Sequence, residues 1–282
     1  MNKFIINGRF EKEGTDVIGV DNRGFRYGDG LFETMKMVEG EVRLAAYHLD
    51  RLRSGMALLQ FEPGKLFNSG QLLSGINELC RKNGCEKLAR VRVSVFRGDG
   101  GLYDESASKV NYVIQSWPLD PAGNQLNENG LVVGIYREIK KSCDRFSNLK
   151  SANYLPYVMG ALYARKNRLN ESIILNTRDR LCDATITNLF LVKGNEIITP
   201  ALTEGCVAGV MRRYLLEKLP GYGFSVSETM ISEKDLPEAG EVFLTNAVSG
   251  IKWVARLEEK EFSNRVSSAI YKDLVGPLFR SL

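Results

Sequence analysis

Residues 199–213 read TPALTEGCVAGVMRR and join a predicted strand to a predicted helix through a loop that holds two glycines. The helix is expected to begin near Gly209. The first N–H groups of a helix have no partner within the helix, so those of Gly209, Val210 and Met211 could bind an anion such as phosphate. The stretch could also be ordinary packing, because neither GK[ST] nor GxGxxG is present.

Four strands and one helix are predicted before or at the start of this stretch, and one strand is predicted after it. Short apolar runs between turn residues are typical of buried strands, and the spacing of Leu155, Val158 and Leu162 is typical of a helix packed on one side. The predicted strands are 131–136, 172–175, 189–192, 196–199 and 242–245, and the helix runs from about 153 to 165. We therefore expect residues 130–282 to form one domain of mixed strands and helices.

The first part of the chain predicts a smaller α+β domain. Asn7-Gly8 is typical of a tight turn, here between strands at 4–6 and 9–11. Residues 118–129 contain two prolines and many polar residues, so we expect them to link a domain of residues 1–117 to the larger one. The other elements predicted in the smaller domain are helices at 48–59 and before Gly84, and strands at 89–96 and 112–114.

Composition excludes several classes of protein. The chain has 282 residues, 44% of them hydrophobic, and no apolar run approaches the roughly 18 residues of a membrane helix. Its 38 basic and 34 acidic residues are interspersed, which argues against a nucleic-acid face. Five cysteines without CxxC spacing or a signal peptide predict a reduced, cytoplasmic protein. A zinc site or His-based hydrolase would rest on His48 alone, so no metal is predicted and His48 is assigned a structural role.

Three further segments carry candidate groups. Lys150, in NLKSANY, is a possible nucleophile if its amine is neutral, although an exposed lysine at a helix start is the simpler interpretation. Asp183 is expected in a turn between two strands, where it could keep a ring nitrogen protonated or serve only the turn. Arg51, in HLDRL, is either a phosphate clamp or a surface charge.

Taken in order, these segments resemble the class IV aminotransferases, the pyridoxal-phosphate family of fold type IV. The family includes branched-chain aminotransferases, D-amino acid aminotransferases and 4-amino-4-deoxychorismate lyases. The resemblance covers nearly the whole chain and implies a two-domain α+β fold, with a small α+β domain, a larger β-barrel-like α/β domain that binds the cofactor, and a homodimer. The matching stretches are YGDGLFET (27–34), HLDRL (48–52), LKSAN (149–153), D-x-T-x-x-N (183–188), residues 199–213 and EVFLTNAVSG (241–250).

The resemblance also implies roles for individual residues. Lys150 would carry pyridoxal 5′-phosphate as a Schiff base and move protons, and Asp183 would pair with the ring nitrogen, although most relatives have Glu there. The phosphate would be held by Arg51 and the N–H groups of Val210 and Met211, the latter standing where many relatives have Thr. The remaining cofactor contacts that it implies are Tyr154, Asn188, Gly209, Asn246 and Ala247.

The substrate is less constrained than the cofactor. The loop RGDGGLY (97–103) and Thr245-Asn246-Ala247 are similar to lyases, but Leu102 stands where lyases often have a second Arg. Tyr27, Arg97 and Tyr154 are candidates for the substrate side, with Arg97 as a carboxylate partner. We predict an aminotransferase that acts on an α-amino acid, of branched-chain or D-amino acid type, and a 2-oxo acid. The alternatives are the lyase, which releases 4-aminobenzoate and pyruvate, and a catalytically silent binding module.

Overall fold

The structure, a computed structural model, describes residues 2–62, 68–104 and 110–280. The chain forms two compact units. Unit 1 comprises Met1–Ala122, Lys150–Asn153 and Arg280–Leu282, and unit 2 comprises Gly123–Leu149 and Tyr154–Phe279. No sequence pattern indicated that the segment around Lys150 would group with unit 1.

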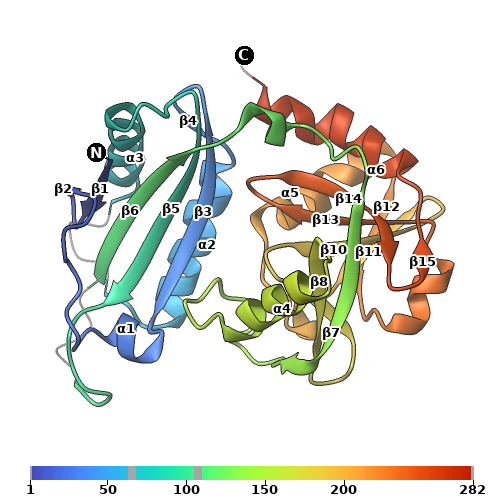
Figure 1. Ribbon diagram of the computed structural model, residues 1–282, viewed down its shortest axis with the longest axis horizontal. Helices are drawn as coiled ribbons and strands as arrows, with labels where there is room; N and C mark the ends of the chain where they lie inside the picture. The colour runs from blue at the N-terminus through green and yellow to red at the C-terminus, as the bar shows by residue number, and fades with distance from the viewer. Residues whose placement is uncertain (1, 63–67, 105–109, 281–282) are drawn as a thin grey trace. The chain divides into compact units, whose positions relative to one another are not determined.

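Unit 1 is built on a six-stranded antiparallel sheet with the order β2-β1-β6-β5-β3-β4 (Figure 1). The predicted hairpin is confirmed, because Ile6 pairs with Arg9 and the turn residues Asn7 and Gly8 have φ of 48° and 82°. The strands are β1 (Lys3–Ile6), β2 (Arg9–Lys12), β3 (Gly30–Val38), β4 (Glu41–Val42), β5 (Leu88–Arg97) and β6 (Val110–Pro118).

Two helices pack on one face of this sheet, α2 (Ala45–Leu58) against β3 and α3 (Ser69–Lys82) against β6 and β1 (Figure 1). Both were predicted, although α2 begins earlier than expected. The short helix α1 (Arg23–Tyr27) precedes β3 and is capped by the side chain of Asn22. The segment before α1 lies over the other face of the sheet, whereas Lys150–Asn153 pairs with the edge of β3.

Unit 2 contains a nine-stranded mixed sheet with the order β12-β11-β10-β13-β14-β7-β8-β9, and β15 pairs with β14. Contacts of β9 with β10 and β11 curl the sheet. Its strands are β7 (Leu131–Lys141), β8 (Glu171–Asn176), β9 (Leu181–Ala184), β10 (Asn188–Lys193), β11 (Glu196–Pro200), β12 (Ser225–Thr229), β13 (Glu241–Asn246), β14 (Gly250–Leu257) and β15 (Lys260–Glu261).

The helices of unit 2 are α4 (Leu155–Lys166), α5 (Val210–Lys218) and α6 (Arg265–Ile270). The packed face expected for α4 was wrong, because Leu155, Val158 and Leu162 are exposed and the helix buries Tyr157, Gly160 and Ala164 instead. Among the described residues, no helix has the length and apolar character needed to cross a membrane. Short 3-10 turns lie at Pro121–Asn124, Leu202–Glu204, Leu219–Tyr222, Glu233–Glu238 and Gly276–Phe279, and a π turn lies at Tyr271–Val275.

Strand β7 continues to Lys141, past the predicted end at Tyr136. Its second half, REIKK, is mostly charged, so apolar periodicity could not reveal it. The pairing of β7 with β8 shifts register between Tyr136 and Lys140. This irregularity brings Lys141 beside Asn176 on β8.

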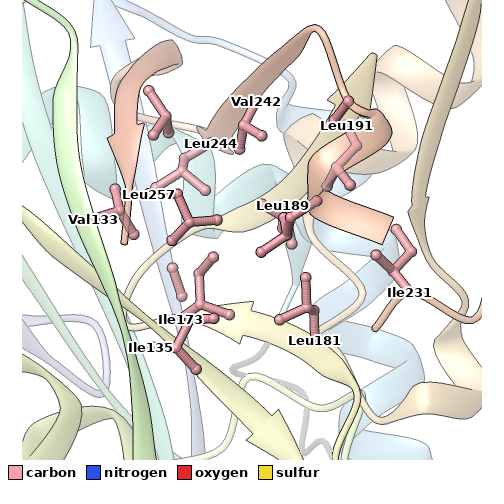
Figure 2. Close-up of a cluster of buried hydrophobic side chains, with 14 of the residues drawn as sticks. Val133, Ile135, Ile173, Leu181, Leu189, Leu191, Ile231, Val242, Leu244 and Leu257 are labelled. Atoms are coloured by element: carbon pink, nitrogen blue, oxygen red, sulfur yellow. The ribbon is translucent and has the colours of Figure 1, made fainter. Parts of the chain in front are cut away.

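The core of unit 2 lies inside the curled sheet. Figure 2 shows apolar side chains from β7, β8, β9, β10, β13 and β14 converging there. Fully burying one such side chain contributes about 1.5–3 kcal/mol. The labelled members are Val133, Ile135, Ile173, Leu181, Leu189, Leu191, Ile231, Val242, Leu244 and Leu257. The strands that end around this core carry the candidate site residues of unit 2.

Candidate functional site

Lys150 lies in unit 1 and is held through its backbone against β3. The N–H of Phe32 donates to the carbonyl of Lys150 at 2.9 Å, and Ser151 forms a bridge with Leu31. The Nζ of Lys150 lies 4.7 Å from the centroid of the Phe32 ring. Because α4 begins only at Leu155 and the lysine is half-buried, Lys150 does not have the setting of an exposed helix-start residue.

Arg51 projects from α2 toward a buried carboxylate on β3. Its Nε donates to Oε1 of Glu33 at 2.7 Å, and its Nη2 donates to Oε2. Nδ1 of His48 lies 2.6 Å from the same Oε2. Burial would raise the pKa of Glu33, but the charges of Arg51 and His48 and their hydrogen bonds lower that pKa to about 2. Glu33 therefore fixes the orientation of the Arg51 guanidinium.

Arg97, at the end of β5, is bound by groups of unit 1. Its Nη1 donates to Asp29 at 2.7 Å, its Nη2 donates to the carbonyls of Leu59 and Gln60, and its guanidinium stacks on Phe61. A substrate carboxylate would meet a cation that Asp29 already neutralises.

Tyr27 is the last residue of α1. The residue is 45% exposed, and the centroid of its ring lies 5.7 Å from the guanidinium of Arg23. The ring is therefore accessible, as a substrate-lining residue would have to be.

In unit 2, Asp183 is buried and receives four hydrogen bonds. Its Oδ1 accepts from Nδ2 of Asn188 at 2.9 Å. Its Oδ2 accepts from the N–H of Val207 at 2.8 Å, the hydroxyl of Tyr157 at 2.9 Å and Nζ of Lys141 at 2.9 Å. Asp183 lies within β9, paired with Ile174, so the expectation that it sits in a turn was wrong. The strand pairing with β8 explains the difference.

The predicted helix start is confirmed, because α5 begins at Val210 with Gly209 as its N-cap and no described side chain caps it. A Cβ on Gly209 would lie 1.8 Å from Oδ1 of Asn188, so only glycine fits there. Asn188 also donates to Asp183 and to the carbonyl of Val207. The side chains of Val210 and Met211 are buried, so their backbone N–H groups are what this helix start can offer to a ligand.

A buried hydroxyl lies on the strand next to Asn188. Thr245 is the β13 partner of Asn188, and its Oγ1 has no hydrogen-bond partner among the described residues. The Oδ1 of Asn246 accepts from the N–H groups of Val248 and Ser249, so this side chain shapes the turn that contains the half-buried Ala247. Sequence reasoning noted Thr245 only as part of the lyase-like Thr245-Asn246-Ala247 and gave its hydroxyl no role.

Tyr154 precedes α4 and donates its hydroxyl to the carbonyl of Thr185 at 2.9 Å. Its ring lies 4.3 Å from that of Tyr157. Sequence reasoning missed Tyr157 and Lys141, which contact the carboxylate that it did identify. Tyr157 stands three residues after Tyr154, on the same side of the predicted helix, and this spacing was a signal for Tyr157. Nothing in the sequence indicated Lys141.

The structure thus brings together Asp183, Asn188 and Gly209 in unit 2, next to Thr245. In unit 1, Lys150 contacts Phe32 and Arg51 contacts Glu33, two consecutive residues of β3. An uncapped helix start, an unpaired buried hydroxyl and a buried carboxylate, all among the described residues, fit a ligand that carries a phosphate and a protonated ring nitrogen, as pyridoxal phosphate does.

Comparison with known proteins gives the family. The model described as amino-transferase class IV matches residues 30–257. An aminodeoxychorismate lyase from Bacillus subtilis is 29% identical, over 94% of this chain and 89% of the relative.

Two solved structures share the fold. The branched-chain amino acid aminotransferase of Escherichia coli has a TM-score of 0.88 at 22% identity, over 99% of this chain and 95% of the other. A hypothetical aminotransferase from Mycobacterium tuberculosis, solved in a PLP-bound form, has a TM-score of 0.83 at 15% identity, over 98% of each chain. These likenesses confirm the predicted two-part α+β fold of type IV, and the chain belongs to the class IV aminotransferases.

Proposed function

We propose that this chain binds pyridoxal 5′-phosphate through Lys150 and transfers an amino group between an α-amino acid and a 2-oxo acid. The observation that carries the proposal is the cluster of Asp183, Asn188 and Gly209, which provides a buried carboxylate beside an uncapped helix start. When bound, the cofactor withdraws electrons from the Cα of the attached substrate.

The residues of this chain would do the rest. The amine of Lys150 tethers the cofactor and, once displaced by the substrate amine, moves the proton at Cα. Asp183 accepts a hydrogen bond from the ring nitrogen. The N–H groups of Val210 and Met211 and the guanidinium of Arg51 bind the phosphate, with Glu33 directing that guanidinium.

The charge on the substrate side favours amino transfer over the lyase reaction. A chorismate-derived substrate carries two carboxylates and would need two cations. Arg97 is already paired with Asp29 at 2.7 Å, and the neighbouring loop offers Leu102, which is 59% exposed and uncharged. An amino acid of the branched-chain or D type has one carboxylate and would need only one cation to bind it.

The test is a spectrum-monitored titration of cofactor-loaded protein with separate L- and D-amino acids. We expect the absorption band of the bound aldehyde form to give way to that of pyridoxamine phosphate with one series, and a 2-oxo acid to reverse the change. Borohydride reduction should add the cofactor's mass to the peptide that contains Lys150, and Lys150→Ala should lose both signals. A reducible adduct that persists on another lysine in Lys150→Ala would contradict the assignment.

The lyase is the second candidate, favoured by the 29% identity to the Bacillus subtilis enzyme over 94% of this chain. The direct assay mixes the loaded protein with aminodeoxychorismate and measures 4-aminobenzoate and pyruvate in equal amounts. Release of both products, with no interconversion of the cofactor forms by any amino acid, would replace the aminotransferase with the lyase.

We further propose that the chain forms a homodimer through unit 1. The sheet face opposite α2 and α3 carries a cavity of about 620 Å³ lined by Val20, Phe25 and Phe32, and Val20 and Phe25 are 75% and 74% exposed. Exposed apolar residues around a cavity are typical of an interface. Light scattering should give twice 31.6 kDa, and Val20→Asp should shift the protein toward monomer.

A cytoplasmic location belongs to the same proposal, because all five cysteines are free thiols. Fractionation of the native cells should recover the protein with the cytoplasmic markers. Recovery with a secreted fraction would contradict this part of the proposal.

A further inference from the structure

Lys141 is a buried lysine to which no role has been given. Its side chain is 9% exposed, and its Nζ lies 2.9 Å from Oδ2 of Asp183 and 5.1 Å from the ring centroid of Tyr157. It reaches Asp183 across one strand, since Lys141 pairs with Asn176 on β8 and β8 pairs with β9. Its placement depends on the register shift in β7, which makes it a specific feature of this sheet.

The two oxygens of Asp183 are used unequally. Oδ2 accepts from Lys141, Tyr157 and the N–H of Val207, whereas Oδ1 accepts, among the described residues, from Asn188 alone. A carboxylate offers roughly four lone-pair sites, about two on each oxygen. Oδ2 is therefore saturated, and the remaining capacity of the carboxylate lies on Oδ1.

We propose that Lys141 and Tyr157 are positioning residues for the cofactor: they occupy Oδ2 of Asp183, direct Oδ1 toward the ring nitrogen of pyridoxal phosphate, and Lys141 weakens the hold of that nitrogen on its proton. The inference rests on the proposed function, because it assigns Asp183 to the ring nitrogen. Neither residue is expected to touch the reacting atoms.

The direction of the effect follows from charge. Burial lowers the pKa of Lys141, but the charge and the hydrogen bond of Asp183, together with the neighbouring thiols of Cys182 and Cys206, leave that pKa raised, so the lysine stays cationic. An ammonium next to the carboxylate cancels part of the negative potential that would otherwise stabilise a protonated ring nitrogen. In the part of the chain that the structure describes, the titratable groups beside Asp183 include the Tyr157 hydroxyl and the thiols of Cys182 and Cys206, and burial raises the pKa of all three, which keeps them neutral.

The test loads the protein with pyridoxal 5′-phosphate labelled with ¹⁵N in the ring and follows the ¹⁵N chemical shift against pH. In Lys141→Met the ring nitrogen should keep its proton to higher pH, with the midpoint raised by about one pH unit or more. Lys141→Arg should restore the midpoint of the unmodified protein. Tyr157→Phe, which removes a donor but no charge, should raise the midpoint by less.

Lys140→Met is the matched control. Lys140 precedes Lys141 on the same strand, but it is paired with Asp179 near the surface, so its removal should leave the midpoint unchanged. An unchanged midpoint in a folded Lys141→Met protein would overturn the inference. If that variant does not fold, Tyr157→Phe decides, and an unmoved midpoint there overturns it as well.

The outcome is separable from a failure of the proposed function. If the unmodified protein shows no bound ¹⁵N signal and no reducible adduct at Lys150, both the function and this inference fail. If it binds the cofactor normally while the variants titrate like the unmodified protein, only the role of Lys141 and Tyr157 fails.

Discussion

The buried carboxylates Glu33 in unit 1 and Asp183 in unit 2 each pair with a basic side chain, and the two pairs differ in construction. In unit 1, Arg51 engages both oxygens of Glu33, and His48 shares one of them. In unit 2, Lys141 engages a single oxygen of Asp183, and uncharged donors supply the other bonds. Glu33 is thus committed to its own cation, whereas Asp183 keeps an oxygen with room for a further donor.

The partners also differ in burial. The Arg51 side chain is 14% exposed, whereas that of Lys141 is 9% exposed and sits over an aromatic ring. A guanidinium near the surface can turn toward water when its partner is removed, but a buried ammonium cannot. We therefore expect the pair in unit 1 to orient Arg51, and the pair in unit 2 to have the tuning role proposed above.

The largest effect is expected from Asp183→Asn in cofactor-free protein. It leaves the ammonium of Lys141 buried without a counter-charge, which should cost about 3–5 kcal/mol in the free energy of unfolding. Urea denaturation followed by circular dichroism measures the loss. The double variant Asp183→Asn with Lys141→Met removes both charges and should recover most of it. A double variant that is no more stable than the single one would break the proposed pairing.

Glu33→Gln should have a smaller effect that depends on pH. The pKa of Glu33 is about 2 in the folded protein against an ordinary value of 4.5, so the ionised group contributes about 3 kcal/mol above pH 4.5. Because the folded pKa is the lower one, this contribution falls as pH drops from 4.5 and is lost through pH 2. Urea denaturation at several pH values should show the variant and the unmodified protein differing at pH 6 and converging toward pH 2. A difference independent of pH would assign the effect to packing.

Sequence reasoning identified one member of each pair and missed the other. Arg51 and Asp183 stand in segments that resemble a family, so the resemblance singled them out as candidates. Glu33 lies in YGDGLFET, but an acidic residue within an apolar strand does not reveal which cation it faces. The role of Lys141 was harder still to predict, because its contact with Asp183 depends on a register shift that no local sequence pattern encodes.

The fold was more accessible than the contacts. Local turn chemistry predicted the hairpin at Asn7-Gly8, and the spacing of apolar residues predicted α2, α3 and the strand β11 before Gly209. The charged half of β7 gave no apolar signal, and the grouping of Lys150–Asn153 with unit 1 depends on long-range pairing with β3. These two features depend on pairing between distant parts of the chain, which the periodicity of apolar residues does not reveal.

The smallest predicted effect sharpens the contrast between satisfied and unsatisfied polar groups within unit 2. Thr245→Val removes a buried hydroxyl that has no partner among the described residues, so cofactor-free protein should become more stable by about 1 kcal/mol. Thr199→Val is the matched control, because the hydroxyl of Thr199 donates to the carbonyl of Leu189 at 2.7 Å, and its loss should destabilise by about 1 kcal/mol. Thermal unfolding of the two variants should show whether the free energy of unfolding rises for Thr245→Val and falls for Thr199→Val. If the hydroxyl binds the phosphate, equilibrium dialysis should show that Thr245→Val retains pyridoxal phosphate more weakly. If both variants are destabilised equally, the hydroxyl of Thr245 stabilises the cofactor-free protein and is not an unsatisfied group available to a ligand.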